Sequence, residues 1–411
     1  MQSEGSKYFA LITKILVLTL MFSQPLFAQR PIIFQLHVSD GDDPISFMRP
    51  YYAIHAAPSG NLSGPPSSAY TPAQLRHAYG FDQVSNQGSG QVIGIVDAYD
   101  DPNIESDFAV FNSKFGLPAC TTANGCFRKV YGNGRKPAAN ANWSIEMALD
   151  VEWAHAIAPQ AKIVLVEAAS NSLSDLLAAV NTAVSNGASV VSMSWTAGEF
   201  SSETRYDNSF LASGVTYLAA SGDMGTGAAY PAASPFVVAV GGTSLYLDSQ
   251  GNYQSETAWS GSGGGLSAYE REPLYQATFG ITADPRGYRG APDVSYNANP
   301  GTGYAVYDSY GFSGASGWFQ VGGTSAGTPQ WAALIAIANS TRAAARKSRL
   351  SSTNSALYSL AKAHMSSDFY PVTQGTNGSC GVWCTAVAGY DYVTGLGTPR
   401  ASALISALVA Q

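Results

Sequence analysis

The chain has 411 residues, of which 45% are hydrophobic and only 12% are charged, and its formal net charge is −7. A chain of this length and composition can bury a large core. The negative charge and the lack of a lysine- or arginine-rich run argue against nucleic acid as a partner. No apolar run is long enough to span a bilayer, so we expect no membrane contact.

The first 28 residues have the pattern of a secretory signal peptide. Lys7 and Lys14 precede a short apolar run over residues 15–22, and Ala28 is a suitable cleavage residue. We therefore expect residues 1–28 to be removed during export. The mature protein would be secreted, either outside the cell or into a periplasm.

Residues 29–69 contain clusters of proline and serine and show no sustained periodicity. This segment is too short for a core of its own. We interpret it as a short pro-segment or N-terminal arm. Residues 70–411 then form one continuous domain.

From residue 70 onward, apolar strand-like runs alternate with helix-like spacing. Strands are expected at residues 91–97, 162–167, 188–194, 216–220 and 236–240, and helices at 144–157 and 172–185. Continuous apolar strands that alternate with helices predict an α/β fold, in which helices cover both faces of a mostly parallel sheet. Ligands of such folds bind beyond the carboxyl ends of the strands.

Two carboxylates, Glu146 and Asp150, stand four residues apart in the first of these helices. That spacing places both groups on one helix face. The surrounding residues 143–153 are largely apolar, which indicates that part of this helix is packed inside the protein. The pair is then a candidate base with a supporting acid. The alternative is two solvated carboxylates on an exposed face.

Ser325 lies in a Gly-rich turn, residues 322–329, that leads into an apolar helix. Such a turn can expose a nucleophile, and a helix N-terminus stabilises the negative charge that develops in acyl transfer. The alternative is a serine or threonine that only caps the helix. A nucleophilic serine needs a base, and none of the five histidines lies in a Gly-rich loop. The carboxylate pair is the better candidate, which indicates a hydrolase that works in acid.

Asp223 follows the expected strand at residues 216–220, in a turn that contains Gly222 and Gly225. One interpretation is an ordinary turn aspartate. The other is a protonated carboxyl that donates a hydrogen bond to an oxyanion, because a carboxyl group is a donor only in its neutral form.

The four cysteines form two close pairs, Cys120 with Cys126 and Cys380 with Cys384. Export favours two short-loop disulfides. A zinc site built from both pairs is the rival interpretation.

The motifs together resemble the sedolisins, or serine-carboxyl peptidases, a family with a subtilisin-like fold. The resemblance covers roughly Tyr70 to the C-terminus and rests on residues 145–159, 219–225, 259–265, 322–329 and 389–399. It implies an endopeptidase that acts on proteins or peptides in acid, and we expect a monomer.

The resemblance also implies a role for each residue that matches. Ser325 becomes the nucleophile, Glu146 the base, Asp150 its hydrogen-bonded partner and Asp223 the oxyanion donor. Asp97 stands where a subtilisin has its catalytic aspartate, and we place it outside the triad. Since Asp223 must be protonated, activity should fall as the pH rises toward neutral.

A calcium site near the C-terminus is a further property that the resemblance implies. Asp391 matches one of its two aspartates, and the carbonyls of Val372 and Gly389 match in position. Pro371 replaces the second aspartate, although Asp368 is near. A site without one charged ligand should bind Ca²⁺ more weakly. We expect no other cofactor.

The chain also departs from the family in having only about forty residues between signal peptide and peptidase domain, where a long prodomain is usual. A catalytically inactive relative that binds peptides therefore remains an alternative. An esterase or lipase is a third hypothesis, but residues 323–327 match its Gly-x-Ser-x-Gly elbow only in form.

Overall fold

The computed structural model describes residues 47–50, 52–57, 64–281 and 286–411. The expected signal peptide and the first part of the expected pro-segment lie outside the described residues. Residues 31–411 group into one compact unit. Within the described residues, we find no helix that is both long enough and apolar enough to cross a membrane.

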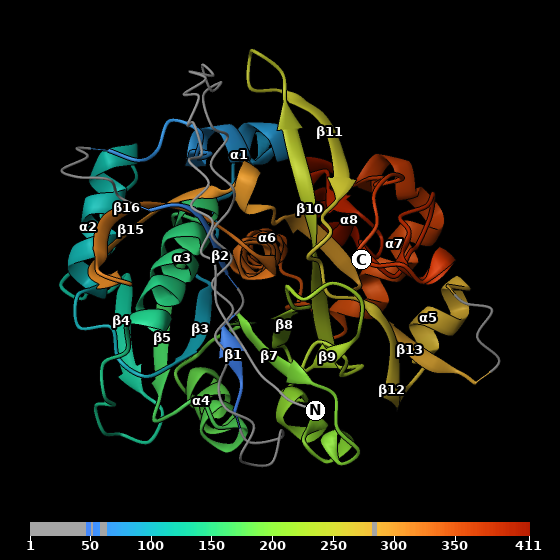
Figure 1. Cartoon of the computed structure of the whole chain (residues 1–411), viewed down its shortest axis with the longest axis horizontal. Helices are drawn as coiled ribbons and strands as arrows, with labels where there is room; N and C mark the ends of the chain where they lie inside the picture. Colours follow the sequence, from blue (N-terminus) through green and yellow to red (C-terminus); the bar gives the residue numbers. More distant parts are fainter. Residues whose placement is uncertain (1–46, 51, 58–63, 282–285) are drawn as a thin grey trace, which may run out of the picture. The chain divides into compact units, whose positions relative to one another are not determined.

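A mostly parallel sheet forms the centre of this unit (Figure 1). Its strand order is β11-β10-β8-β6-β3-β5-β4, with β14 beside β10. Neighbouring strands are parallel, except that β11 is antiparallel to β10. The strands are β3 (Val92–Ala98), β4 (Phe127–Tyr131), β5 (Lys162–Ala168), β6 (Val190–Met193), β8 (Thr216–Ala220), β10 (Val237–Leu247), β11 (Tyr253–Ala258) and β14 (Val294–Asn297).

All five strands expected from the sequence are present, but β10 continues well past residue 240. Gly241 and Gly242 interrupt the apolar run in the sequence, yet they lie inside the strand. A Cβ atom at Gly241 would lie 2.5 Å from Pro292 Cγ, and one at Gly242 would lie 2.7 Å from Ala298 Cβ. The two glycines therefore mark close packing and not the end of the strand.

Helices cover both faces of the sheet, as the sequence predicted. Side chains on a strand alternate between faces. On β3, a Cβ atom at Gly94 would lie 2.9 Å from Ala183 Cβ of α4 (Leu173–Ser185). The Asp97 side chain, on the opposite face, interacts with the carboxyls of α3 (Ala141–Ile157). Helices α3 and α4 therefore lie on opposite faces.

Helix α6 (Thr324–Ala344) packs against α3 and against strands β6, β8 and β10. It follows β16 (Ala315–Gly322) through Gly323, whose φ of 122° belongs to the region that favours glycine. A Cβ atom at Gly327 would lie 2.7 Å from the Tyr296 Cβ atom, so a small residue is needed for this close packing. This approach packs the start of α6 closely against β14.

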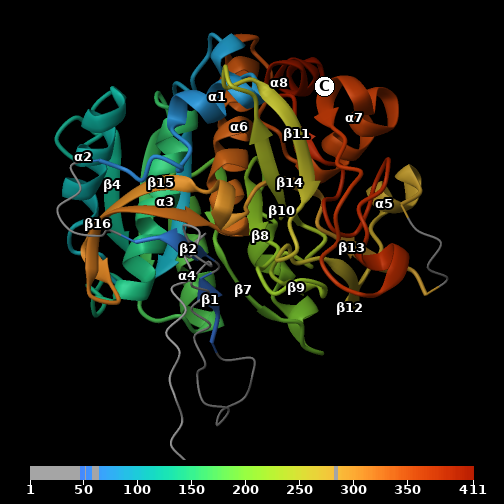
Figure 2. The same ribbon diagram turned by 45° about the horizontal axis from the view of Figure 1, so that its top comes forward.

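Smaller elements surround the central sheet (Figure 2). Short sheets have the orders β1-β7-β9, β15-β16-β2, β12-β13 and β17-β18. Their strands are β1 (Arg49–Pro50), β2 (Ala53–Ala56), β7 (Trp195–Gly198), β9 (Ala229–Tyr230), β12 (Gly265–Arg271), β13 (Tyr288–Ala291), β15 (Tyr304–Phe312), β17 (Phe369–Tyr370) and β18 (Thr398–Pro399). The remaining α-helices of the described residues are α1 (Pro72–Tyr79), α2 (Ile104–Phe115), α5 (Leu274–Phe279), α7 (Thr353–Asp368) and α8 (Ala401–Ala410).

Both cysteine pairs are disulfides, Cys120–Cys126 and Cys380–Cys384. Their Cα–Cα distances are 4.9 and 5.3 Å, within the usual range. The disulfide interpretation is therefore confirmed, and the zinc alternative is wrong.

Candidate active site

Helix α3 carries two candidate catalytic carboxyls into the interior. Asn140 caps the helix, because its side chain accepts hydrogen bonds from the backbone N–H groups of Asn142 and Trp143. Glu146 and Asp150 are both 0% exposed. The alternative of two solvated carboxylates on an exposed face is therefore wrong.

Ser325 lies in the first turn of α6, and its side chain is also fully buried. Its Oγ donates a hydrogen bond to the backbone oxygen of Ser194, at 3.3 Å. Pro329, four residues further on, has no N–H group to offer to the Ser325 carbonyl. The Ser194 Oγ lies 3.5 Å from that carbonyl oxygen.

Ser194 lies between Ser325 and the carboxyl pair; the sequence indicated residues 192–195 as a possible wall of the cleft but assigned Ser194 no catalytic role. It directly follows β6, and its Oγ donates to Asp150 Oδ1 at 2.9 Å. The only sequence signal was its position after an apolar strand, where ligands bind in parallel sheets. Its contacts are with residues 44 and 131 positions away, so no local pattern could identify them.

The pKa of Glu146 lies well above its usual range. Burial is the main cause, and the charges of Asp150 and Asp97 raise it further. Hydrogen bonding to nearby Ser325 lowers it in part, although neither Glu146 oxygen has a hydrogen bond of standard geometry. The hydroxyl and the carboxyl are therefore neighbours, but the Ser325 proton points to Ser194.

The pKa of Asp150 is also raised well above its usual range, by burial first and then by Asp97, while the bond from Ser194 lowers it. Asp97 lies near the end of β3, and burial raises its pKa to about 8. Neither of its carboxylate oxygens has a hydrogen-bond partner. Asp97, Glu146 and Asp150 thus interact, and groups that interact this closely titrate together.

Asp223 reaches the start of α6 from the loop after β8. Its Oδ1 accepts hydrogen bonds from the backbone N–H and the Oγ1 of Thr324, both at 2.8 Å. Its Oδ2 is buried and has no hydrogen-bond partner. Burial raises the pKa of Asp223 to about 7, although the bonds from Thr324 lower it in part. Asp223 is thus protonated in acid, beside Ser325.

The expected N-terminal arm lies over this site. Residues 47–50 and 52–57 are its first described part, and β1 within it pairs antiparallel with β7. Pro50 lies opposite Trp195, the residue after Ser194. The pKa of Tyr52 is raised, by burial first and then by the charge of Glu146. The arm therefore passes close to the buried Glu146 carboxyl.

The expected calcium ligands do not fit a calcium site. The Asp391 carboxylate is buried and accepts four hydrogen bonds, two on each oxygen. Thr394 supplies two of these bonds, at 2.8 and 2.9 Å. Pro371 adds no carboxylate, and no metal-ligating cluster in the described part of the chain includes Asp391. The donors around Asp391 use the lone pairs that a cation would need.

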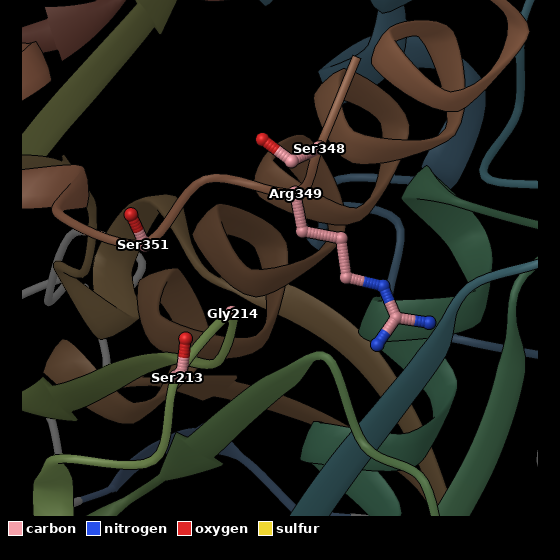
Figure 3. Close-up of a pocket in the computed structure, with 5 residues that line it drawn as sticks. All are labelled: Ser213, Gly214, Ser348, Arg349 and Ser351. Carbon is pink, nitrogen blue, oxygen red and sulfur yellow. The ribbon is translucent and has the colours of Figure 1, made fainter. Parts of the chain in front are cut away.

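A pocket of about 340 Å³ lies away from these residues, where Ser348, Arg349 and Ser351 follow the far end of α6 (Figure 3). Ser213 and Gly214, before β8, complete its lining. The Arg349 side chain extends away from Ser213 and Ser351 (Figure 3). None of the candidate catalytic residues lines this pocket.

Comparison with known proteins finds a matching family model and similar sequences. The family model described as the subtilase family matches residues 137–411. The chain is 32% identical to kumamolisin of Bacillus sp. (strain MN-32), over 90% of this chain and 70% of that protein. It is 30% identical to sedolisin of Pseudomonas sp. (strain 101), over 71% of this chain but only 53% of that protein.

A solved structure extends the agreement to the fold. Pseudomonas sedolisin, described as a serine-carboxyl proteinase complexed with two molecules of pseudo-iodotyrostatin, has a TM-score of 0.72 and 26% identity. The match covers 85% of this chain and 100% of that chain. A lanthipeptide protease with a TM-score of 0.51 and 14% identity shares the fold alone.

Proposed function

Because the chain belongs to the subtilase family and, within it, to the sedolisin-type serine peptidases, we propose that it is a secreted endopeptidase that works in acid. One observation carries this proposal. Ser325, which starts α6, lies beside a buried carboxyl pair and a raised-pKa aspartate, and histidine is absent from these contacts. Proteins or peptides are the proposed substrates.

The first chemical step is an attack by Ser325 Oγ on the carbonyl carbon of the scissile peptide bond. Glu146, once ionised, accepts the hydroxyl proton as the new C–O bond forms. When the tetrahedral intermediate collapses, the C–N bond breaks, and the proton on Glu146 moves to the leaving amine. Water then attacks the acyl-enzyme, with Glu146 as base, and the released Ser325 oxygen regains a proton.

Asp150 and Asp223 have different tasks in this mechanism. Asp150 shares a proton with Glu146, because two adjacent buried carboxyls resist double ionisation. The unpartnered Oδ2 of Asp223 carries a proton in acid and donates it as a hydrogen bond to the developing oxyanion. Because the pKa of Asp223 is about 7, this donor is lost as the pH rises through that value.

The test of this function is the pH–rate profile of the processed protein on a quenched peptide, compared with Ser325→Ala. We expect a maximum in acid and a loss of roughly 10⁶ in kcat in the variant, as for a serine peptidase nucleophile. A folded, processed protein with no activity from acid to neutral pH would instead favour an inactive relative that binds peptides. Ester hydrolysis that peaks near neutral pH would favour an esterase.

We also propose that the N-terminal arm, residues 29–69, is a pro-segment that blocks the cleft until it is removed. The support is geometric. The arm adds a strand to β7 next to Ser194, and peptide substrates can bind to the edge of a sheet in the same way. With the arm in place, the Ser325 side chain is fully buried. Removal would give both substrate and water access to Ser325.

The test of the arm is processing of the full chain on acidification. We expect the uncleaved chain to be inactive and activity to appear with cleavage between Ala57 and Tyr70, and we expect Ser325→Ala to stay uncleaved. A full chain that cleaves added peptide with its arm intact would contradict the blocking role. Sequencing of the new N-terminus distinguishes the two results.

A further inference from the structure

A second group of buried carboxyls lies outside the candidate active site, where α2, α3 and β15 pack together. Asp101 belongs to the loop that joins β3 to α2, Asp107 to α2 and Asp308 to β15. All three side chains are buried, and one carboxylate oxygen of each lies within 4.8 Å of the other two. A cation about 2.4 Å from each oxygen requires such spacing.

The positive side chains of this region form ion pairs with carboxylates outside the cluster, although Lys129 Nζ also donates a hydrogen bond to the backbone carbonyl of Asp101, at 2.6 Å. Lys129 Nζ lies 2.6 Å from Asp100 and 2.9 Å from Glu167, and Lys136 also pairs with Asp100. In the part of the chain that the structure describes, none of the ion pairs includes a member of the cluster. Burial is the main cause that raises the pKa of Asp101; the charges of Asp308 and Asp107 raise it further, and the charge of Lys129 lowers it.

A fourth carboxyl faces the cluster from α3. Glu152 is fully buried, and its pKa is raised well above its usual range, by burial first. The bond from the Tyr307 N–H lowers that pKa, while the charges of Asp107, Asp308 and Asp101 raise it. The charge of Asp308 also raises the pKa of Tyr52, which belongs to the arm. Four buried carboxyls therefore lie together without a paired cation.

Asp101 supplies an oxygen that no donor satisfies. Its Oδ1 accepts the backbone N–H of Asn103 at 2.8 Å, but its Oδ2 is buried and has no hydrogen-bond partner. Asp107 and Asp308 also accept hydrogen bonds, but Asp107 Oδ2 accepts only the Ser309 N–H, at 2.7 Å, and Asp308 Oδ2 accepts only the Ser144 hydroxyl, at 3.2 Å. Unlike the oxygens of Asp391, each of these two oxygens keeps a lone pair for a cation. A buried carboxylate oxygen without a donor needs either a proton or a cation.

We propose that Asp101, Asp107 and Asp308 form a binding site for a divalent cation, with Ca²⁺ the best-suited ion. Three carboxylates make an all-oxygen donor set, which favours a hard cation over zinc or copper. Ca²⁺ accepts irregular coordination by six to eight oxygens, whereas Mg²⁺ demands near-ideal octahedral geometry. The site is separate from Asp391, whose carboxylate is already saturated by donors.

Protons compete with the cation at this site. Burial raises the pKa of Asp101 to about 8 and that of Asp308 to about 6. Ligands must be deprotonated to bind a metal, so metal binding at such a site releases protons.

The test is a calorimetric titration of Ca²⁺ alone into the EDTA-treated full chain near neutral pH, with Ser325→Ala as the background to prevent self-cleavage. We expect one site, release of protons on binding, and a higher melting temperature with Ca²⁺. Asp101→Asn should weaken binding by roughly 10–100-fold or more, on the scale known for disturbed metal sites. Asp391→Asn is the matched control and should leave binding unchanged.

Two results would overturn the proposal. The absence of binding heat and of a thermal shift at about 10 mM Ca²⁺, above the range of weak extracellular sites, would mean that protons alone neutralise the cluster. Binding that survives Asp101→Asn but is lost in Asp391→Asn would place the ion in the C-terminal loop. Circular dichroism shows whether each variant is folded, and Asp308→Asn replaces Asp101→Asn if that variant is not.

Discussion

Asp293 and Glu146 are both fully buried carboxyls, but they differ in the hydrogen bonds and charges around them. Asp293 lies 2.7 Å from a guanidinium nitrogen of Arg289 and also accepts hydrogen bonds from the Tyr358 hydroxyl and the Ala239 N–H. Glu146 has no hydrogen bond of standard geometry, and the neighbouring charges are carboxylates. An ion-paired carboxylate with all its hydrogen bonds formed contributes to the stability of the fold. An unsatisfied one can exchange a proton.

After Ser325→Ala, Glu146→Gln should have the largest effect, because it removes the only proposed proton acceptor for Ser325. We expect kcat to fall by roughly 10⁴ or more, on the scale seen when a subtilisin triad member is lost. Stability should change little or increase at neutral pH, since an amide replaces an unsatisfied buried carboxyl. Single-turnover kinetics and urea unfolding measure the two effects. Activity near the wild-type level would exclude Glu146 as the base.

Arg289→Met tests the other side of the comparison. Arg289 is buried and contacts Asp293 through both terminal nitrogens, at 2.7 and 3.0 Å. Its loss leaves an uncompensated buried carboxylate, which costs about 3–5 kcal/mol of unfolding free energy. The kcat per folded molecule should stay close to that of the wild type. A variant with normal stability but lower kcat would mean that this ion pair serves catalysis.

Asp223 combines the two behaviours, because one of its oxygens is saturated by Thr324 and the other is free. Asp223→Ala should lower kcat by roughly 10²–10³, the usual effect of losing one oxyanion donor. Asp223→Asn keeps a neutral donor at every pH. It should therefore lose less activity than Asp223→Ala in acid.

The pH dependence of these variants separates a proton effect from a packing effect. The pKa of Asp223 is raised to about 7, so the wild-type carboxyl is a donor below that pH and loses its proton above it. Wild-type activity should fall as the pH rises through about 7. In Asp223→Asn, this fall of activity at alkaline pH should be smaller or should occur at higher pH. An identical limb in both proteins would assign it to another group.

The sequence could reveal the features that depend on local patterns, but not those that depend on contacts between distant segments. Apolar runs predicted the parallel sheet and helix α3, and the resemblance to the sedolisins singled out Glu146, Asp150, Asp223 and Ser325, which lie near the start of α6. Each of these signals is local. The degree of burial of Glu146 was not predictable, because it depends on α6, β3 and the arm, which are distant in the sequence.

Three other features depended on contacts between distant segments. The extension of β10 follows from Pro292 and Ala298, which lie against its glycines. The pairing of the arm with β7 joins residues about 145 positions apart. The Asp101 cluster draws one residue each from a loop, a helix and a strand. Periodicity in a single sequence carries no information on such long-range contacts.

Ser194→Ala should have the smallest effect of the set, because Ser194 positions Asp150 and does not touch the scissile bond. The substitution removes a 2.9 Å hydrogen bond to a carboxyl, so we expect kcat/KM to fall roughly tenfold to a hundredfold. The bond from Ser194 lowers the pKa of Asp150, and without it the acid limb of the pH profile should move to higher pH.

Ser192→Ala is the matched control, because the buried Ser192 Oγ lies two residues upstream and has no hydrogen-bond partner. It should leave both kcat/KM and the acid limb unchanged. Ser194→Thr keeps a hydroxyl, so the acid limb of its pH profile should lie at the wild-type position, even if its extra methyl lowers the rate. If Ser192→Ala and Ser194→Ala reduce kcat/KM equally without moving the limb, the Ser194 hydroxyl only fills space. If only Ser194→Ala moves it, a single neutral hydroxyl tunes the protonation of the catalytic pair.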